Sequence, residues 1–249
     1  MKIKINPGTT PDRIRLICLH IQDGINTYEK LKEHIIPNIF KSDSLNDNIQ
    51  AALELKLIKI DKDIYKLKIT KNHLENIKVF KYIISKALIE DNTYMSYLQS
   101  ILASEISLKG SLSDISDFLR SNNPQIDESV NYLRGFRFWF QYLGYGFYSE
   151  GSDKRFYVSL YNRLKILIDN DLFEGRILYS KFIELIIKES PEISVLINNK
   201  KFDNKLTLAL KNLEYNNIIK SLSQKDAYDF VIFDEFGIEN RYSDIERVI

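Results

Sequence analysis

The sequence has little of what builds disulfides, metal sites or membrane spans. Cys18 is the single cysteine, which excludes an internal disulfide and a zinc site made of cysteines. His20, His34 and His73 are isolated, with no second ligand at metal-binding spacing, so we expect no metal site. No stretch approaches the roughly 18 uninterrupted apolar residues of a membrane helix, and MKIKINPGTTPDR lacks the apolar core of a signal peptide. These absences predict a cytoplasmic protein without cofactor, in which Cys18, inside the apolar run IRLICLHI, is a buried and inert thiol.

Catalytic motifs are lacking as well. Gly144-Tyr145-Gly146 follows a predicted helix and precedes a predicted strand, whereas a dinucleotide-binding loop has the reverse order. Glu54-Leu55-Lys56 has the spacing of a nuclease core but no supporting Asp on an earlier strand. Asp234-Glu235 is a pair of adjacent acids, which seldom binds a cation alone. We therefore expect that the protein is not an enzyme and takes no small-molecule substrate, and an enzyme remains the least favoured alternative.

The overall charge is balanced. Thirty-five Lys and Arg face thirty-four Asp and Glu in 249 residues, with 44% hydrophobic and 28% charged residues, which is typical of a globular protein. The whole chain therefore exerts no net attraction on DNA or anionic lipid, and any affinity for nucleic acid must come from a local patch.

The first seventy residues alternate helical and strand patterns. Thr9-Thr10-Pro11-Asp12 is a strong helix start, and two further helices are predicted from Thr27 and from about Ser44. The period then changes to two, so that Leu57–Ile60 and Ile64–Ile69 are predicted to form a β-hairpin. Three helices followed by a hairpin is the order of elements in a winged helix, and residues 11–70 resemble that superfamily.

Residues 74–233 are predicted to repeat this order twice. The middle copy has helical patterns at Leu74–Ile89, Tyr94–Ser104, 113–120 and Asp127–Tyr142, with strands at Tyr145–Ser149 and Arg155–Leu160. The last copy has helices at 161–170, 180–189 and 204–215, with hairpin strands at Asn217–Leu222 and Tyr228–Phe233. We predict an α+β, mostly helical fold of serial winged-helix domains at 1–72, 73–160 and 161–233. Residues 234–249 are predicted to be a C-terminal tail or docking segment.

The run FRFWFQYLGYGFY at 136–148 places eight aromatic residues in thirteen positions. A base-stacking surface and a densely packed core are both compatible with such a run. Helical spacing of Phe136, Phe140 and Leu143 favours the core.

Candidate DNA contacts lie in the first two predicted hairpins and in the helix before the second. The helix before the first hairpin contains Asp47 and Glu54 and would repel phosphates. The first hairpin is rich in lysine, and a phosphate-contacting wing or lysines that merely protect strand edges explain it equally well. The candidates are Lys59, Lys62, Lys66, Lys68, Arg134, Arg137, Lys154 and Arg155. The third copy is slightly acidic with the tail included, which favours a protein-facing role.

Serial winged-helix units with an aromatic segment such as FWFQYLGYGF resemble accessory components of bacterial phage-defence operons, among them the G component of the Dpd 7-deazaguanine DNA-modification system. The resemblance implies a non-enzymatic subunit of a DNA-processing assembly, with other subunits of the same system as partners. We therefore expect weak contact with duplex DNA, and the alternative is a protein–protein adaptor or scaffold that does not touch DNA.

Overall fold

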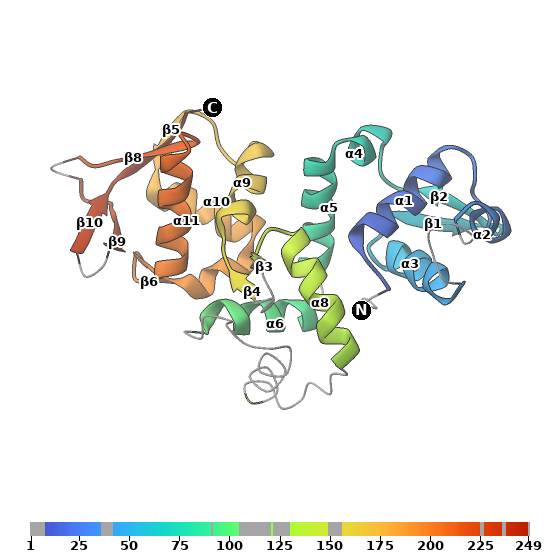
Figure 1. The fold of residues 1–249 in the computed structure, drawn as a ribbon. Coiled ribbons are helices and arrows are strands. Elements are labelled where there is room, and N and C mark those ends of the chain that lie inside the picture. Colours follow the sequence, from blue (N-terminus) through green and yellow to red (C-terminus); the bar gives the residue numbers. More distant parts are fainter. Residues whose placement is uncertain are drawn as a thin grey trace. The chain divides into compact units, whose positions relative to one another are not determined.

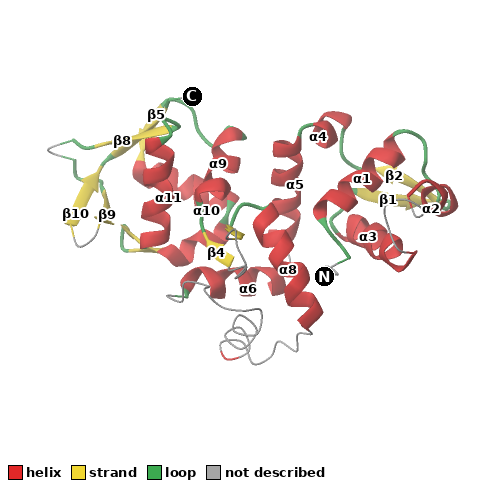
Figure 2. Ribbon diagram, viewed as in Figure 1, coloured by secondary structure: helices red, strands yellow, loops and turns green. Residues whose placement is uncertain are grey.

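The computed structural model describes residues 8–35, 42–90, 92–104, 121, 130–148, 156–224, 227–235 and 238–248; inside these ranges, the side chains of 42–43, 92–93, 130–134, 137, 148, 156, 234–235 and 238 are also not described. Helices dominate, with small sheets between them, so the predicted α+β, mostly helical class is confirmed (Figure 2). The chain divides into two compact units. The N-terminal unit comprises Met1–Thr93 and Leu112–Tyr142, and the C-terminal unit comprises Tyr94–Ser111 and Leu143–Ile249.

The N-terminal unit begins with three helices, α1 (Pro11–Gln22), α2 (Tyr28–Ile35) and α3 (Ser42–Glu54), as the sequence pattern predicts (Figure 1). Thr10 caps α1 by accepting a hydrogen bond from the backbone N–H of Arg13, and Pro11 occupies the first turn. Apolar side chains of the three helices, among them Ile17, Leu31 and Leu45, are fully buried and form the core. Cys18 is buried there too, and burial raises the pKa of its thiol to about 12.

A hairpin of β1 (Ile58–Asp61) and β2 (Ile64–Leu67) follows. Its two-residue turn places Lys62 at φ 48° and Asp63 at φ 63°, the combination that matches the twist of a tight hairpin. The backbone N–H of Tyr65 donates to the carbonyl of Asn26 at 2.7 Å, so the segment between α1 and α2 runs beside β2. The hairpin is therefore attached to the helices along its second strand.

The remaining elements among the described residues of the N-terminal unit are helices: α4 (Lys71–Glu75), α5 (Ile77–Ile89) and α8 (Val130–Tyr142). The single helical pattern predicted at Leu74–Ile89 is wrong, because the side chain of Asn76 accepts hydrogen bonds from the backbone N–H groups of Lys78 and Val79 and starts a new helix. Trp139 of α8 donates its indole N–H to the carbonyl of Thr9 at 2.9 Å and holds the start of α1 against α8. α6 (Asn92–Ala103) begins in this unit and continues into the other.

The second segment of the C-terminal unit starts with the antiparallel pair β3 (Gly146–Tyr148) and β4 (Phe156–Val158). Its helices are α9 (Tyr161–Asp169), α10 (Tyr179–Glu189), the 3-10 helix η1 (Pro191–Leu196) and α11 (Asn204–Tyr215). Its remaining strands are β5 (Arg176–Leu178), β6 (Ile197–Asn198), β7 (Lys201–Phe202), β8 (Ile219–Leu222), β9 (Val231–Glu235), β10 (Ile238–Tyr242) and β11 (Asp244–Arg247).

The later strands of this unit form two sheets. One has the order β5-β11-β8 and is antiparallel throughout, and the other has the order β10-β9-β7-β6 with β7 parallel to β9. The hairpin predicted between 217–222 and 228–233 is therefore wrong, because β8 pairs with β11 and β9 pairs with β10 and β7. Burial explains the difference: Phe233 of β9 packs on Tyr179 and Phe202, with ring centroids at 5.6 and 5.2 Å.

The segment predicted as a tail or docking segment, 234–249, contributes β10 and β11 to these sheets. Ile245 of β11 is fully buried between β5 and β8. No described helix is long and apolar enough to cross a membrane.

The aromatic run divides between interior and surface. Phe136, Phe140 and Leu143 are each no more than 3% exposed and are core as predicted, and the rings of Trp139 and Tyr145 are equally buried. Phe138 and Phe147 instead are 43% and 48% exposed. Most of the described rings of the run therefore pack in the interior, and the rings of Phe138 and Phe147 lie at the surface.

Candidate nucleic-acid interface

The basic hairpin, residues 58–68, presents lysines on its outer face. Ile58 pairs with Leu67 on the inner face, where Ile58 is buried, whereas Lys59 lies opposite Lys66 on the outer face. Two like charges directly opposite each other repel across a strand pair. An anion bound to this face would relieve that repulsion.

Asp61 partly neutralises the outer face. The ammonium of Lys66 donates to the Asp61 carboxylate at 2.5 Å. This hydrogen bond, followed by the Coulombic attraction of the same lysine, lowers the pKa of Asp61 below its ordinary value. Because both side chains are about half exposed, the pair contributes little to stability. The main effect of the pair is that Lys66 is less available to bind a phosphate.

The other lysines of the basic hairpin are exposed and make no ion pair in the described part of the chain. Lys62 is in the turn and Lys68 follows β2, while Lys59 is on β1. The structure therefore brings the first four predicted residues together on one hairpin, and three of them, Lys59, Lys62 and Lys68, have no ion-pair partner within the described ranges.

The remaining predicted contacts cannot be added to this surface. Arg134 and Arg137 lie in α8, but their side chains are outside the described residues. Lys154 and Arg155 fall outside the described residues altogether.

The helix before the hairpin is unsuited to a DNA groove. Between Ser42 and Glu54, α3 contains no Lys or Arg. Asn48, which could have contacted a base, is fully buried and donates to the carbonyls of Gly8 and Ser44 at 2.8 and 2.6 Å. Gln50 is exposed but donates to Glu54 at 3.1 Å. A contact with DNA would thus involve the hairpin and not this helix.

Several lysines of the C-terminal unit form ion pairs with acids of the same unit. Lys200 binds Asp229 at 2.8 Å, and Lys201 binds Glu239 at 3.1 Å. Both lysines of α11 are paired, Lys205 with Asp203 at 3.7 Å and Lys211 with Glu214 at 3.1 Å. These pairs make α11 a poor phosphate contact.

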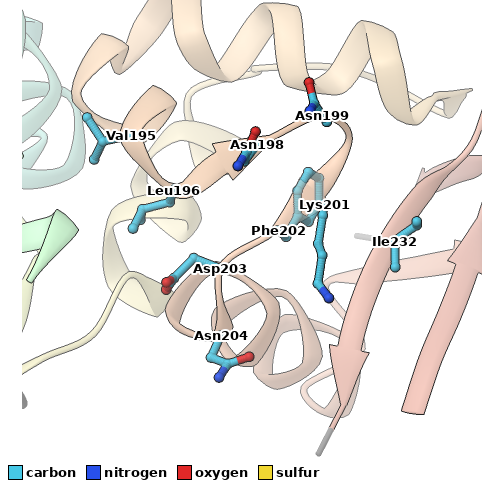
Figure 3. Close-up of a pocket in the computed structure, with 9 residues that line it drawn as sticks. All are labelled: Val195, Leu196, Asn198, Asn199, Lys201, Phe202, Asp203, Asn204 and Ile232. Carbon is cyan, nitrogen blue, oxygen red and sulfur yellow. The ribbon is translucent and has the colours of Figure 1, made fainter. Parts of the chain in front are cut away.

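A pocket of about 560 Å³ lies between the β6–β7 turn, the start of α11 and β9 (Figure 3). Asn198, Asn199 and Asn204 supply amides, and Phe202 and Leu196 supply an apolar floor. Asp203, the acid of the pocket, caps α11 by accepting from the backbone N–H of Lys205 at 2.8 Å. The lining contains no histidine, cysteine or hydroxyl side chain, and its cation, Lys201, binds Glu239 at 3.1 Å.

A buried polar cluster of the C-terminal unit was missed by sequence reasoning. Arg163 and Glu192 are both fully buried, with their Nε and Oε1 atoms 3.6 Å apart. Ser190 accepts from Arg163 Nε at 2.8 Å and donates to Glu192, to which Tyr145 also donates. Burial raises the pKa of Tyr145 well above its ordinary value, so its hydroxyl stays a donor. No local pattern indicates this cluster, because its members come from three separate segments, at 145, 163 and 190–192.

No arrangement of three or more His, Cys, Asp or Glu side chains that could hold a metal ion occurs within the described ranges. Comparison with protein-family models, curated proteins and solved structures finds no match for this chain.

Proposed function

We propose that the chain is a winged-helix accessory subunit of a DNA-processing assembly, of the kind found in bacterial phage defence, which contacts the phosphate backbone of duplex DNA weakly through the basic hairpin. The observation that carries the proposal is the set Lys59, Lys62 and Lys68, which are exposed on one tight hairpin and make no ion pair with a described residue. Lysines at such positions bind phosphates and release counterions.

The order of elements supports the winged-helix assignment in both units. In the N-terminal unit, α1, the segment at Asn26, α2, α3, β1 and β2 follow one another, and β2 is bonded to both Asn26 and β1. In the C-terminal unit, α9, β5, α10, α11, β8 and β11 have the same order, and β11 lies between β5 and β8. The β6–β7 turn and the β9–β10 pair are then insertions, the second one at the position of the wing.

The composition of α3 determines which part of DNA the protein can contact. A winged helix usually reads bases with its third helix and touches the backbone with its wing. Here α3 has no cation and its Asn48 is buried, so only the backbone contact remains. Phosphate contacts carry no base information, and we expect binding that does not depend on sequence.

The test is a fluorescence-anisotropy titration of two unrelated duplexes of equal length at low salt. Both should bind with about the same affinity, and the double variant K59E/K62E should weaken both about equally. The double variant K181E/K188E, at two exposed lysines of α10 in the C-terminal unit, is the charge-matched control and should change little. A strong preference for one duplex, or equal losses in the control, would reject the hairpin as the contact.

A protein–protein adaptor is the second candidate. The ion pairs of Lys200, Lys201 and Lys211 favour it for the C-terminal unit, because they leave a surface that is nearly neutral. If the adaptor is correct, the folded protein binds neither duplex at any salt concentration. Co-purification with proteins encoded beside it should then survive K59E/K62E.

A further inference from the structure

The strand β10 lies at one end of its sheet, with β9 beside it on one side (Figure 1). Its five residues, Ile238–Tyr242, include no proline and no lysine. Proteins usually protect such an edge with lysine, proline, a bulge or a covering element, because its N–H and C=O groups can pair with another strand. β6, at the other end of the sheet, has two residues and offers a much shorter edge.

The register identifies the backbone groups that β10 presents at this edge. The N–H of Ile232 in β9 donates at 2.9 Å to a carbonyl of the β6–β7 turn, so it points toward β7. Because these groups alternate in direction along a strand, those of Phe233 point toward β10, where Asn240 is the partner. The N–H and C=O groups of Glu239 and Arg241 therefore point away from β9. The described part of the chain provides no backbone hydrogen bond to them.

Side chains on both faces of the sheet hold β10 in place. On the face toward α11, the ring centroid of Tyr242 lies 4.8 Å from that of Phe233, and the Tyr242 hydroxyl accepts from Lys211 at 2.8 Å. On the opposite face, the guanidinium of Arg241 lies 4.7 Å from the centroid of the Phe230 ring. The edge strand is therefore in position before a partner strand arrives.

The charges of β10 are complementary to those of a second copy. Glu239 and Arg241 are exposed on one face of the strand, on either side of Asn240. In an antiparallel pair with a two-fold axis at Asn240, Glu239 of each copy lies opposite Arg241 of the other, and such a pair attracts. An axis at Glu239 or at Arg241 would place two acids or two arginines opposite each other. The charges therefore select the axis at Asn240.

The existing ion pair of Glu239 is compatible with this arrangement. Lys201 binds Glu239 at 3.1 Å, with both side chains about half exposed. A carboxylate has two oxygens and accepts from more than one donor, so Glu239 can bind Lys201 and an arginine of a second copy together.

We infer that β10 pairs with β10 of a second copy of this chain, antiparallel and centred on Asn240. Glu239 and Arg241 of opposite copies then exchange backbone hydrogen bonds, and the sheet continues from one copy into the other. The contact is isologous, as in most homodimers. A single pair of short strands buries less than the about 1,200–2,000 Å² of a stable interface, so the dimer is reversible. The contact uses no residue of the basic hairpin and does not depend on DNA.

Sedimentation velocity over a range of protein concentrations measures the monomer–dimer equilibrium without DNA. Glu239→Arg places two pairs of arginines opposite each other and should raise the concentration of half-dimerisation at least about tenfold. The double variant E239R/R241E makes the opposed charges attractive again and should restore most of the dimer. Asp229→Arg, at an acid that binds Lys200 at 2.8 Å, is the matched control and should change little.

A disulfide tests the position of the axis. A residue on the axis faces its own copy at a Cα distance of about 4.5 Å, which a disulfide can span. Asn240→Cys should therefore form a covalent dimer under mild oxidation, whereas Tyr215→Cys, at an exposed position of α11, should not. Cys18 is buried and contributes no background.

Three outcomes would overturn the inference. They are a protein of native melting temperature that stays monomeric at every concentration, a dimer that Glu239→Arg does not weaken, and cross-linking of Asn240→Cys that is no faster than that of Tyr215→Cys. None of them bears on duplex binding, because no duplex is present.

Discussion

Within α8, adjacent rings have different roles. Phe140 is 1% exposed, with its ring centroid 5.7 Å from that of Phe136, whereas Phe138 is 43% exposed. Removal of a buried Phe loses transfer free energy and leaves a cavity, so Phe140→Ala should lower the free energy of unfolding by about 3–5 kcal/mol. Phe138→Ala, the control, should change it by only about 0.5 kcal/mol. Urea denaturation measures both, and equal losses would show that the ring environments are misassigned.

The Arg163–Glu192 cluster tests how a buried charge is tolerated. The terminal nitrogens of Arg163 and Glu192 Oε2 are buried without a hydrogen-bond partner among the described residues. Breaking a buried pair leaves an uncompensated charge, so Arg163→Met should cost about 3–5 kcal/mol of unfolding free energy. Adding Glu192→Gln removes that charge yet can still accept from Tyr145, and should restore part of the loss. A double variant less stable than Arg163→Met would contradict this explanation.

For single residues, the sequence predicts which side chains are exposed better than it predicts their hydrogen-bond and ion-pair partners. Alternation along the strands places Lys59 and Lys66 on the outer face, where they are found. The ion pair between Lys66 and Asp61 depends on the register of the two strands across the turn. The composition of the segment does not reveal this register. Asn48 resembles a base-reading side chain, but it shares a helical face with the buried Leu45 and Ala52 and satisfies buried carbonyls instead.

Among the elements, the basic hairpin has the clearest functional expectation. Asp61 both repels phosphates and occupies Lys66. Asp61→Asn removes one negative charge and frees one ammonium, so it should tighten duplex binding and make the log–log salt slope steeper by about one. Anisotropy titrations at several salt concentrations measure the change, with Asp171→Asn, an acid of the C-terminal unit that binds Arg247, as the control. An unchanged affinity would mean that phosphates do not approach this face.

Helices and the two local hairpins, β1–β2 and β3–β4, were predictable, and the strand partners in the later sheets were not. The helical patterns at 161–170, 180–189 and 204–215 correspond to α9, α10 and α11, because apolar residues at helical spacing are a local signal. β6 and β7 have two residues each, too few for a strand period to be recognised. β11 lies between β5 and β8, and Asp244 pairs with both Leu178 and Leu222, which are distant in the chain. Such pairings depend on tertiary burial and leave no local pattern.

The whole molecule distributes its charge unevenly although the total is close to neutral. Residues 1–72 contain thirteen Lys and Arg against nine Asp and Glu, whereas residues 161–249 contain thirteen against fifteen. The excess of positive charge therefore lies in the unit with the basic hairpin. This distribution supports DNA contact by the N-terminal unit and contact with protein partners by the C-terminal unit.

The most direct test of this account is the salt dependence of duplex binding by the intact chain. Lys59, Lys62 and Lys68, which make no ion pair with a described residue, give a log–log slope of about −3 if each neutralises one phosphate. Binding should then be weak and fade as salt approaches physiological concentration, and K59E/K62E should reduce the slope to about −1, the contribution of Lys68. Tight binding that ignores salt, or a slope that K59E/K62E does not change, would contradict the assignment of the basic hairpin as the DNA contact.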